Sequence, residues 1–103
     1  MTTQMDIYEG DGGTIFRVTI TDNSIVIDIS NATAKYIRFK QPDGTILLKS
    51  ANFSSDGKDG KIQYIAESGF LDTVGVWELR GVITTPAGHW TSTKGSFTVK
   101  EID

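Results

Sequence analysis

The feature that most constrains the fold is a period-two alternation of apolar and polar residues. Between Phe16 and Ile20 the apolar side chains occupy every second position, and Arg17 and Thr19 lie between them. Successive side chains of a β-strand point to opposite faces, so this alternation predicts a strand with one buried face and one solvated face.

The same pattern recurs along the whole chain, which predicts an all-β protein. The expected strands are residues 15–20, 25–29, 35–40, 45–49, 60–65, 75–84 and 92–101. Turn-forming residues separate them, and Pro42-Asp43-Gly44 is the clearest hairpin signal. We therefore predict an immunoglobulin-like antiparallel β-sandwich of about seven to eight strands, with a small barrel as the alternative.

One segment departs from the alternation. Residues 66–73 could form a single helical turn, which Gly69 weakens, so we expect a connector that buries Phe70 and Leu71.

Length and charge narrow the class of protein further. The chain has 103 residues, so we expect one domain over residues 1–103, with residues 1–6 as an extended N-terminal arm. The net charge of −3 gives no electrostatic reason to bind nucleic acid or an anionic membrane. No run is apolar and long enough to span a membrane, and the absence of cysteine excludes disulfides and thiolate metal sites.

Catalytic and metal-binding motifs are not evident. The one histidine, His89, has no nucleophile or acid near it in the sequence and is interpreted as a surface residue. Residues 56–60 contain two aspartates but lack the spacing and the distal glutamate of a calcium loop. Asp6, Glu9 and Asp11 are interpreted as a solvated turn. We expect no enzyme activity, no metal and no cofactor.

The order of several short segments resembles a known family. These segments are Tyr8-Glu9-Gly10-Asp11, Asp28-Ile29-Ser30-Asn31-Ala32-Thr33, Gly60-Lys61-Ile62-Gln63-Tyr64 and Gly75-Val76-Trp77. Together they resemble the N-terminal domain of phage baseplate upper proteins and its stand-alone Ig-like relatives. The resemblance implies a virion protein, made in the bacterial host cytoplasm, that docks on other capsid, neck, tail or baseplate proteins. Because the chain ends at Asp103, without the C-terminal region of multi-domain relatives, an accessory or decoration role is expected.

Strand parity separates a core from a candidate docking face. The residues assigned to the core are Phe16, Ile37, Phe39, Tyr64, Trp77, Leu79, Ile83, Phe97 and Val99. In an Ig-like sandwich the strands around residues 37, 79 and 97 are neighbours, so their outward side chains share one surface. The predicted partner-binding residues are Tyr36, Arg38, Arg80, Val82 and, if the alternation continues through residues 91–96, Trp90. Aromatic and arginine side chains are enriched at interface hot spots.

Two alternatives remain open at this stage. A carbohydrate-binding or adhesin-like module would use Trp90, Trp77 and Tyr36 as exposed platforms for a glycan. Docking could also proceed through an open sheet edge or the N-terminal arm, including in a homo-oligomer within a symmetric assembly.

Overall fold

The computed structural model describes residues 7–10 and 12–101, and these form strands and turns but no helix. The predicted N-terminal arm, residues 1–6, lies outside the described residues. Within the described residues, the strands are β1 (Ile7–Tyr8), β2 (Ile15–Thr19), β3 (Thr21–Asp22), β4 (Ile25–Val26), β5 (Ala34–Lys40), β6 (Ile46–Ser50), β7 (Asn52–Phe53), β8 (Lys61–Ile65), β9 (Gly75–Thr85), β10 (Gly88–Thr91) and β11 (Gly95–Lys100). The prediction of an all-β chain is confirmed.

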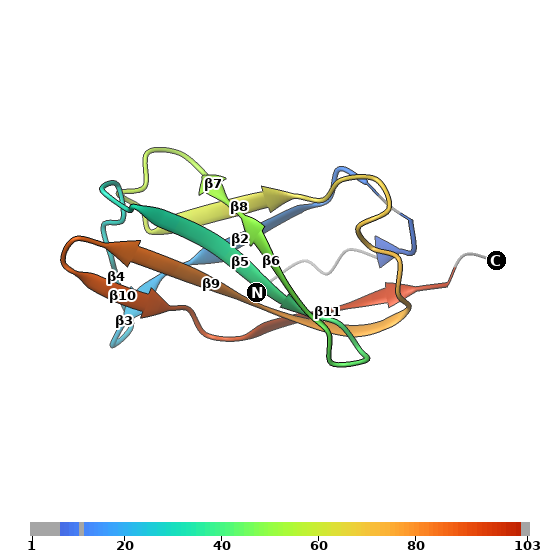
Figure 1. The fold of residues 1–103 in the computed structure, drawn as a ribbon. Coiled ribbons are helices and arrows are strands. Elements are labelled where there is room, and N and C mark those ends of the chain that lie inside the picture. The colour runs from blue at the N-terminus through green and yellow to red at the C-terminus, as the bar shows by residue number, and fades with distance from the viewer. Residues whose placement is uncertain (1–6, 11, 102–103) are drawn as a thin grey trace.

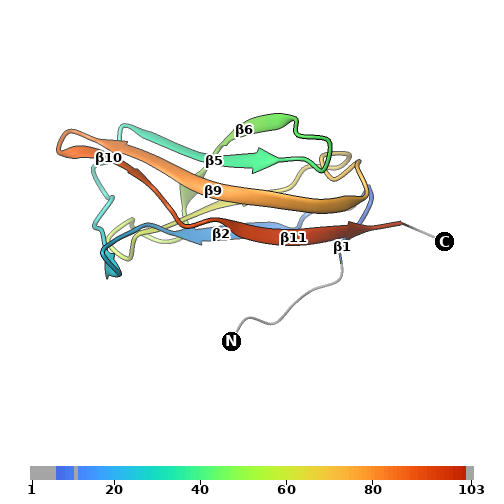
Figure 2. The same cartoon turned by 90° about the horizontal axis from the view of Figure 1, so that it is seen from below.

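The strands form two layers that face each other (Figures 1 and 2). The larger sheet has the order β1-β11-β9-β5-β6, and β10 also pairs with β9. The smaller sheet has the order β2-β8-β7, and β3 and β4 form a separate hairpin. Figure 2 shows β5 and β9 in one layer and β2 in the other. The 11-residue β9 is the central strand of the larger sheet, because it pairs with β5 on one side and with β10 and β11 on the other.

An aromatic cluster joins the two sheets. Phe39, on β5, is fully buried, and its ring packs edge-on against Phe16 of the smaller sheet at a centroid distance of 5.3 Å. The Phe39 ring also contacts Phe70 at 4.9 Å and Trp77 at 6.5 Å. Edge-to-face contacts of this kind add to the free energy gained from burying the rings. The assignment of the Phe39 and Trp77 side chains to the core is therefore confirmed.

The connector between β8 and β9 packs as predicted. Phe70 is 8% exposed and Leu71 is fully buried, so this segment closes one end of the core. Its backbone forms a turn in which the Phe70 N–H donates to the Glu67 carbonyl at 3.1 Å. Burial of these two side chains, and not helical propensity, shapes the segment.

The hairpin predicted at residues 42–44 is present in the structure, whereas the strand predicted over residues 25–29 is not. At Pro42-Asp43-Gly44, the Gly44 N–H donates to the Gln41 carbonyl at 2.9 Å and Gly44 adopts a φ of 91°. The expected strand over residues 25–29, with its isoleucines on one buried face, is wrong. Its regular part is only β4, and Ile25 is 68% exposed. The cause is the tight β3–β4 hairpin, which projects residues 25–26 outward before the chain returns to bury Ile29.

Trp77→Ala tests the aromatic cluster. Trp77 is fully buried, and its indole N–H donates to the Thr73 carbonyl at 2.8 Å. We expect the substitution to lower the free energy of unfolding by about 3–5 kcal/mol, because it leaves a large cavity. Val76→Ala, at an exposed neighbouring position, is the control and should change stability by about 0.5 kcal/mol or less. Equal urea midpoints for the two variants would contradict this role of Trp77.

Candidate functional site

The outward surface of the larger sheet is the candidate functional site. We call this surface the outer face, and it comprises the side chains of β5, β6, β9 and β11 that point away from the smaller sheet. Directly opposed residues on paired strands share a face. In the row across the middle of the outer face, Leu48 lies opposite Arg38, and Arg38 lies opposite Arg80. In the next row, Tyr36 lies opposite Val82. The predicted residues Tyr36, Arg38, Arg80 and Val82 are therefore brought together on one surface.

The two arginines form an unusual pair. Arg38 and Arg80 are both exposed and lie directly across from each other on neighbouring strands. Within residues 7–10 and 12–101, neither guanidinium forms an ion pair. Like charges directly opposite each other in a sheet are destabilising. The arrangement therefore costs folding free energy and leaves two planar hydrogen-bond donor groups available to a carboxylate of another molecule.

The acid on this face is already engaged. The Lys94 ammonium group donates to the Glu78 carboxylate at 3.1 Å. This hydrogen bond, followed by the charges of Lys94, Lys40 and Arg80, lowers the pKa of Glu78 below its ordinary value of 4.5. On the outer face Arg38, Lys40 and Arg80 outnumber Glu78, so this face has a positive net charge although the chain as a whole has a net charge of −3.

Apolar side chains accompany the cations. Ile46 and Leu48, on the edge strand β6, are 42% and 57% exposed, and Val76, on β9, is 58% exposed. Tyr36 and Val82 are half-buried in the row next to the arginines, on the side away from Ile46 and Val76. Our sequence analysis missed Ile46 and Leu48, although their alternation with Leu47 already placed them on the face opposite the core. A mixture of arginine, tyrosine and aliphatic groups is the composition of a protein interface.

Trp90 does not belong to the outer face, so its expected position beside the other partner-binding candidates is wrong. Trp90 lies opposite the buried Ile83, it is half-buried, and it packs against the core. Phe97 lies opposite Trp77, so seven residues of β9, from 77 to 83, are matched by eight residues of the partner segment, from 90 to 97. One extra residue on one strand is a β-bulge. It reverses the sheet face to which the side chains of the preceding strand, β10, point relative to those of β11.

Ser92 stabilises this bulge. Its backbone N–H donates to the Gly81 carbonyl at 2.9 Å, and its hydroxyl accepts the Gly81 N–H at 2.7 Å. The same hydroxyl donates to the Thr93 carbonyl at 2.9 Å. The serine side chain thus replaces a backbone carbonyl of the ladder, and Ser92 is 3% exposed. The burial of Ser92 is visible only in the structure, so the sequence of residues 90–97 gave no signal of the inversion.

Ser92→Ala is expected to lower the free energy of unfolding by about 1–3 kcal/mol, because it leaves the buried Gly81 N–H without an acceptor. Ser96→Ala, at an exposed position of β11, is the matched control. Guanidinium unfolding followed by Trp fluorescence measures both. If the two variants were equally stable, the hydroxyl would not be the element that holds the bulge.

The titration of Glu78 provides a test of the electrostatics of the outer face. Because its folded pKa is lowered, the ionised carboxylate contributes stability above its unfolded pKa, and this contribution is lost as pH falls through the folded pKa. Lys94→Met should raise the pKa of Glu78, and Arg80→Met should raise it less, since Arg80 acts only through its charge. NMR titration of the Glu78 carboxyl carbon measures the change. An unchanged pKa in Lys94→Met would contradict the assignment.

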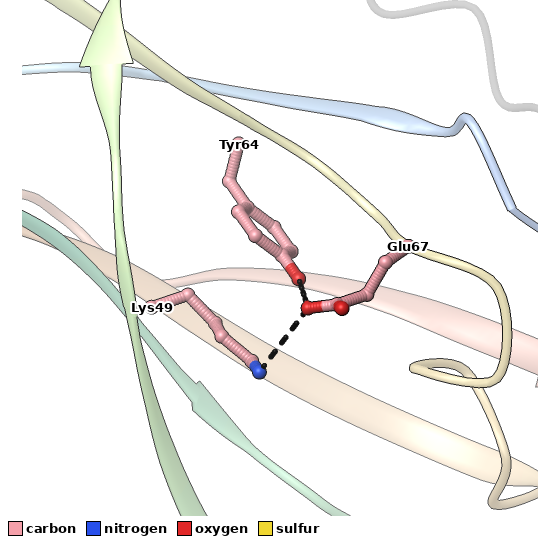
Figure 3. Close-up of polar contacts among 3 residues, drawn as sticks. All are labelled: Lys49, Tyr64 and Glu67. Carbon is pink, nitrogen blue, oxygen red and sulfur yellow. Dashed lines mark hydrogen bonds and ion pairs between the residues drawn. The ribbon is translucent and has the colours of Figure 1, made fainter.

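A second polar group lies at the end of the molecule near the connector (Figure 3). The Tyr64 hydroxyl donates to Glu67 at 3.1 Å, and the Lys49 ammonium group lies 3.6 Å from the same carboxylate oxygen. Burial, the hydrogen bond to Glu67 and the charge of Glu67 raise the pKa of Tyr64. The adjoining pocket, about 250 Å³ and lined by Lys49, Phe70 and residues 67–69, is shallow, and Glu67 is 70% exposed. The group therefore ties β6 and β8 to the connector and has no enclosed site for a ligand.

The remaining polar candidates have structural partners. His89 lies on β10, where its Nδ1 is 3.0 Å from the Thr84 hydroxyl. Asp56 and Asp59 each accept a backbone N–H two residues ahead, as turn-forming aspartates do. Among the described residues, no three His, Cys, Asp or Glu side chains gather as a metal site would require. Asp6 and Asp11 lie outside the described residues.

No helix in the described part of the chain is long and apolar enough to cross a membrane. The class defined by the fold and the outer face is a small all-β domain with an exposed, cationic sheet surface.

Comparison with known proteins identifies the family. The chain belongs to the BppU N-terminal domain family, the N-terminal domain of phage baseplate upper proteins, which it matches over residues 1–99. The chain is thus related to phage baseplate structural proteins, and membership implies a virion component that contacts other virion proteins. No curated protein matches the chain.

A solved structure supports the fold. CopC from Methylosinus trichosporium OB3b superposes with a TM-score of 0.55 at 14% sequence identity, covering 96% of this chain and 88% of that chain. At this identity the likeness concerns the arrangement of strands alone.

Proposed function

We propose that this chain is a non-enzymatic structural module of the phage particle that docks on a neighbouring virion protein through the outer face. The observation that carries the proposal is the opposed pair Arg38 and Arg80, with exposed Leu48 beside it. The repulsion between the two adjacent arginines is relieved when carboxylates of an acidic partner cover them. Docking on such a partner therefore explains why two like charges lie side by side.

The partner surface should be acidic and partly apolar. Carboxylates of the partner would accept bidentate hydrogen bonds from the two guanidinium groups, and apolar side chains would cover Leu48 and Val76. The partner belongs to the baseplate, or to the tail, neck or capsid if the chain serves as a decoration or accessory protein. Synthesis in the host cytoplasm followed by assembly is part of the same proposal.

We further infer that the two layers form an immunoglobulin-like sandwich. In support, β11, β9, β5 and β6 are neighbours in the larger sheet and β2, β8 and β7 in the smaller one. This is the order that the strands G-F-C-C′ and B-E-D take in variable-type immunoglobulin domains. The parallel pairing of β1 with β11 is consistent with that assignment.

The alternative, a carbohydrate-binding or adhesin-like module, receives less support. Trp77 is fully buried, and Trp90 packs on the core side of its strand. Of the three proposed platforms, Tyr36 alone points outward, and it is half-buried. A glycan surface of coplanar exposed rings is therefore not assembled among the described residues.

Arg80→Glu separates docking from folding. The substitution places a carboxylate directly opposite Arg38, so the like-charge repulsion becomes an attraction and the melting temperature should stay level or rise. At the same time the acidic partner is repelled. We expect the number of copies per purified particle, measured by quantitative mass spectrometry, to fall at least about tenfold.

Arg17→Glu is the matched control, because Arg17 is an exposed arginine on the smaller sheet, away from the outer face. It should be incorporated like the wild type. If Arg80→Glu were also incorporated normally, or if both variants were lost equally, docking through the outer face would be ruled out.

A further inference from the structure

The open edge of the larger sheet at β6 is a second exposed feature, separate from the arginine pair. β6 pairs with β5 on one side and, within the described part of the chain, has no strand on the other. The Ala51 N–H donates to the Lys35 carbonyl at 3.0 Å and the Gln41 N–H donates to the Thr45 carbonyl at 2.8 Å. Odd-numbered residues of this segment therefore hydrogen-bond toward β5. By the alternation of an antiparallel ladder, the backbone groups of residues 46, 48 and 50 point to the open side.

The side chains on this edge do not protect it. Natural edge strands are blunted by charged residues, by proline, by bulges or by being very short. The other edge strand of five residues, β2, has the exposed Arg17 at its centre, whereas the five-residue β6 has Leu48 there, at 57% exposure. Ile46 and Ser50, the other outward residues of β6, are also uncharged.

Lys49 is the one charge on β6, and it is compensated within the chain. It points to the core side, where its ammonium group lies 3.6 Å from a Glu67 carboxylate oxygen (Figure 3). The same ammonium group lies 5.2 Å from the centre of the Phe70 ring. A lysine held in this way stays with its own subunit when another strand adds to the edge.

We propose that β6 pairs with β6 of a second copy of this chain, antiparallel and about a two-fold axis at Leu48. This register gives the largest overlap of two identical five-residue strands and places Leu48 opposite its counterpart. The neutral edge lets two copies approach although each has a net charge of −3. The proposal is independent of docking through the outer face, since it concerns the purified chain alone.

The area that two paired β6 strands can bury is small, and this limits the affinity that we expect for the dimer. Stable dimers generally bury about 800 Å² per partner, more than two short edge strands can cover. We therefore expect weak self-association in dilute solution. The same pairing becomes effective where an assembly holds two copies close together, because the local concentration is then high.

Cysteine trapping tests the register directly, because the chain contains no native cysteine. In the proposed dimer, the two residues at position 48 form a hydrogen-bonded pair with Cα atoms about 5.5 Å apart, within the range of a disulfide. Leu48→Cys should form a covalent dimer under mild oxidation at least about tenfold faster than Val76→Cys, whose position is equally exposed on the same sheet.

Ile46→Cys is the control for register. Residue 46 lies opposite residue 50 of the second copy, so the two residues at position 46 are about 14 Å apart and should not form a disulfide. A mixture of Ile46→Cys and Ser50→Cys should form the mixed dimer. Dimer formation by Leu48→Cys at the rate of Val76→Cys or of Ile46→Cys would overturn the proposal.

Leu48→Lys provides a readout without cross-linking. It introduces the charge that protected edges have, so it should abolish any rise of sedimentation coefficient with concentration, whereas Val76→Lys should preserve it. Failure of these tests would leave the arginine-pair experiment on phage particles unaffected, so the two proposals are distinguishable.

Discussion

The packing of Phe39 between the two sheets is the interaction on which the rest of the structure depends. Its ring contacts Phe16 from the smaller sheet, Phe70 from the connector and Trp77 from β9, so one side chain joins three parts of the chain. Once Phe39 points inward, strand geometry forces Arg38 outward, and pairing with β9 places Arg80 beside it. The core thus fixes which charges meet on the outer face.

Acidic side chains are common in the turns of the molecule, whereas basic side chains predominate on the outer face. Turns contain several of the acids, among them Asp28 and Asp43, each of which accepts a backbone N–H two residues ahead. These hydrogen bonds lower the pKa values of both carboxyls. On the outer face, Arg38, Lys40 and Arg80 outnumber the one acid, Glu78, so a chain with a net negative charge presents a sheet surface with a net positive charge. The chain belongs to the BppU N-terminal domain family, and this is the surface that we propose for its attachment to a neighbouring protein.

Much of this arrangement could be predicted from residue alternation alone. Parity correctly placed Phe39, Trp77 and Val99 inside and Arg38 and Arg80 outside, because each lies within an uninterrupted strand. Prediction failed where the ladder is interrupted. The bulge at Ser92 inverted Trp90, and the β3–β4 hairpin exposed Ile25. The bulge depends on where one residue is inserted relative to the partner strand, and the hairpin depends on where the chain turns; residue alternation encodes neither. Leu48 lies on an edge strand because of the order of the strands in the sheet, and residue alternation does not reveal that order.

The central claim is that the outer face of the larger sheet contacts another virion protein. Cryo-electron microscopy of the intact phage particle, at a resolution that separates strands, tests it most directly. The account predicts that Arg38 and Arg80 lie within hydrogen-bonding distance of carboxylates of a neighbouring chain. Density that shows both arginines facing solvent, with contacts made instead by the smaller sheet around Ile15 and Ile65, would contradict it.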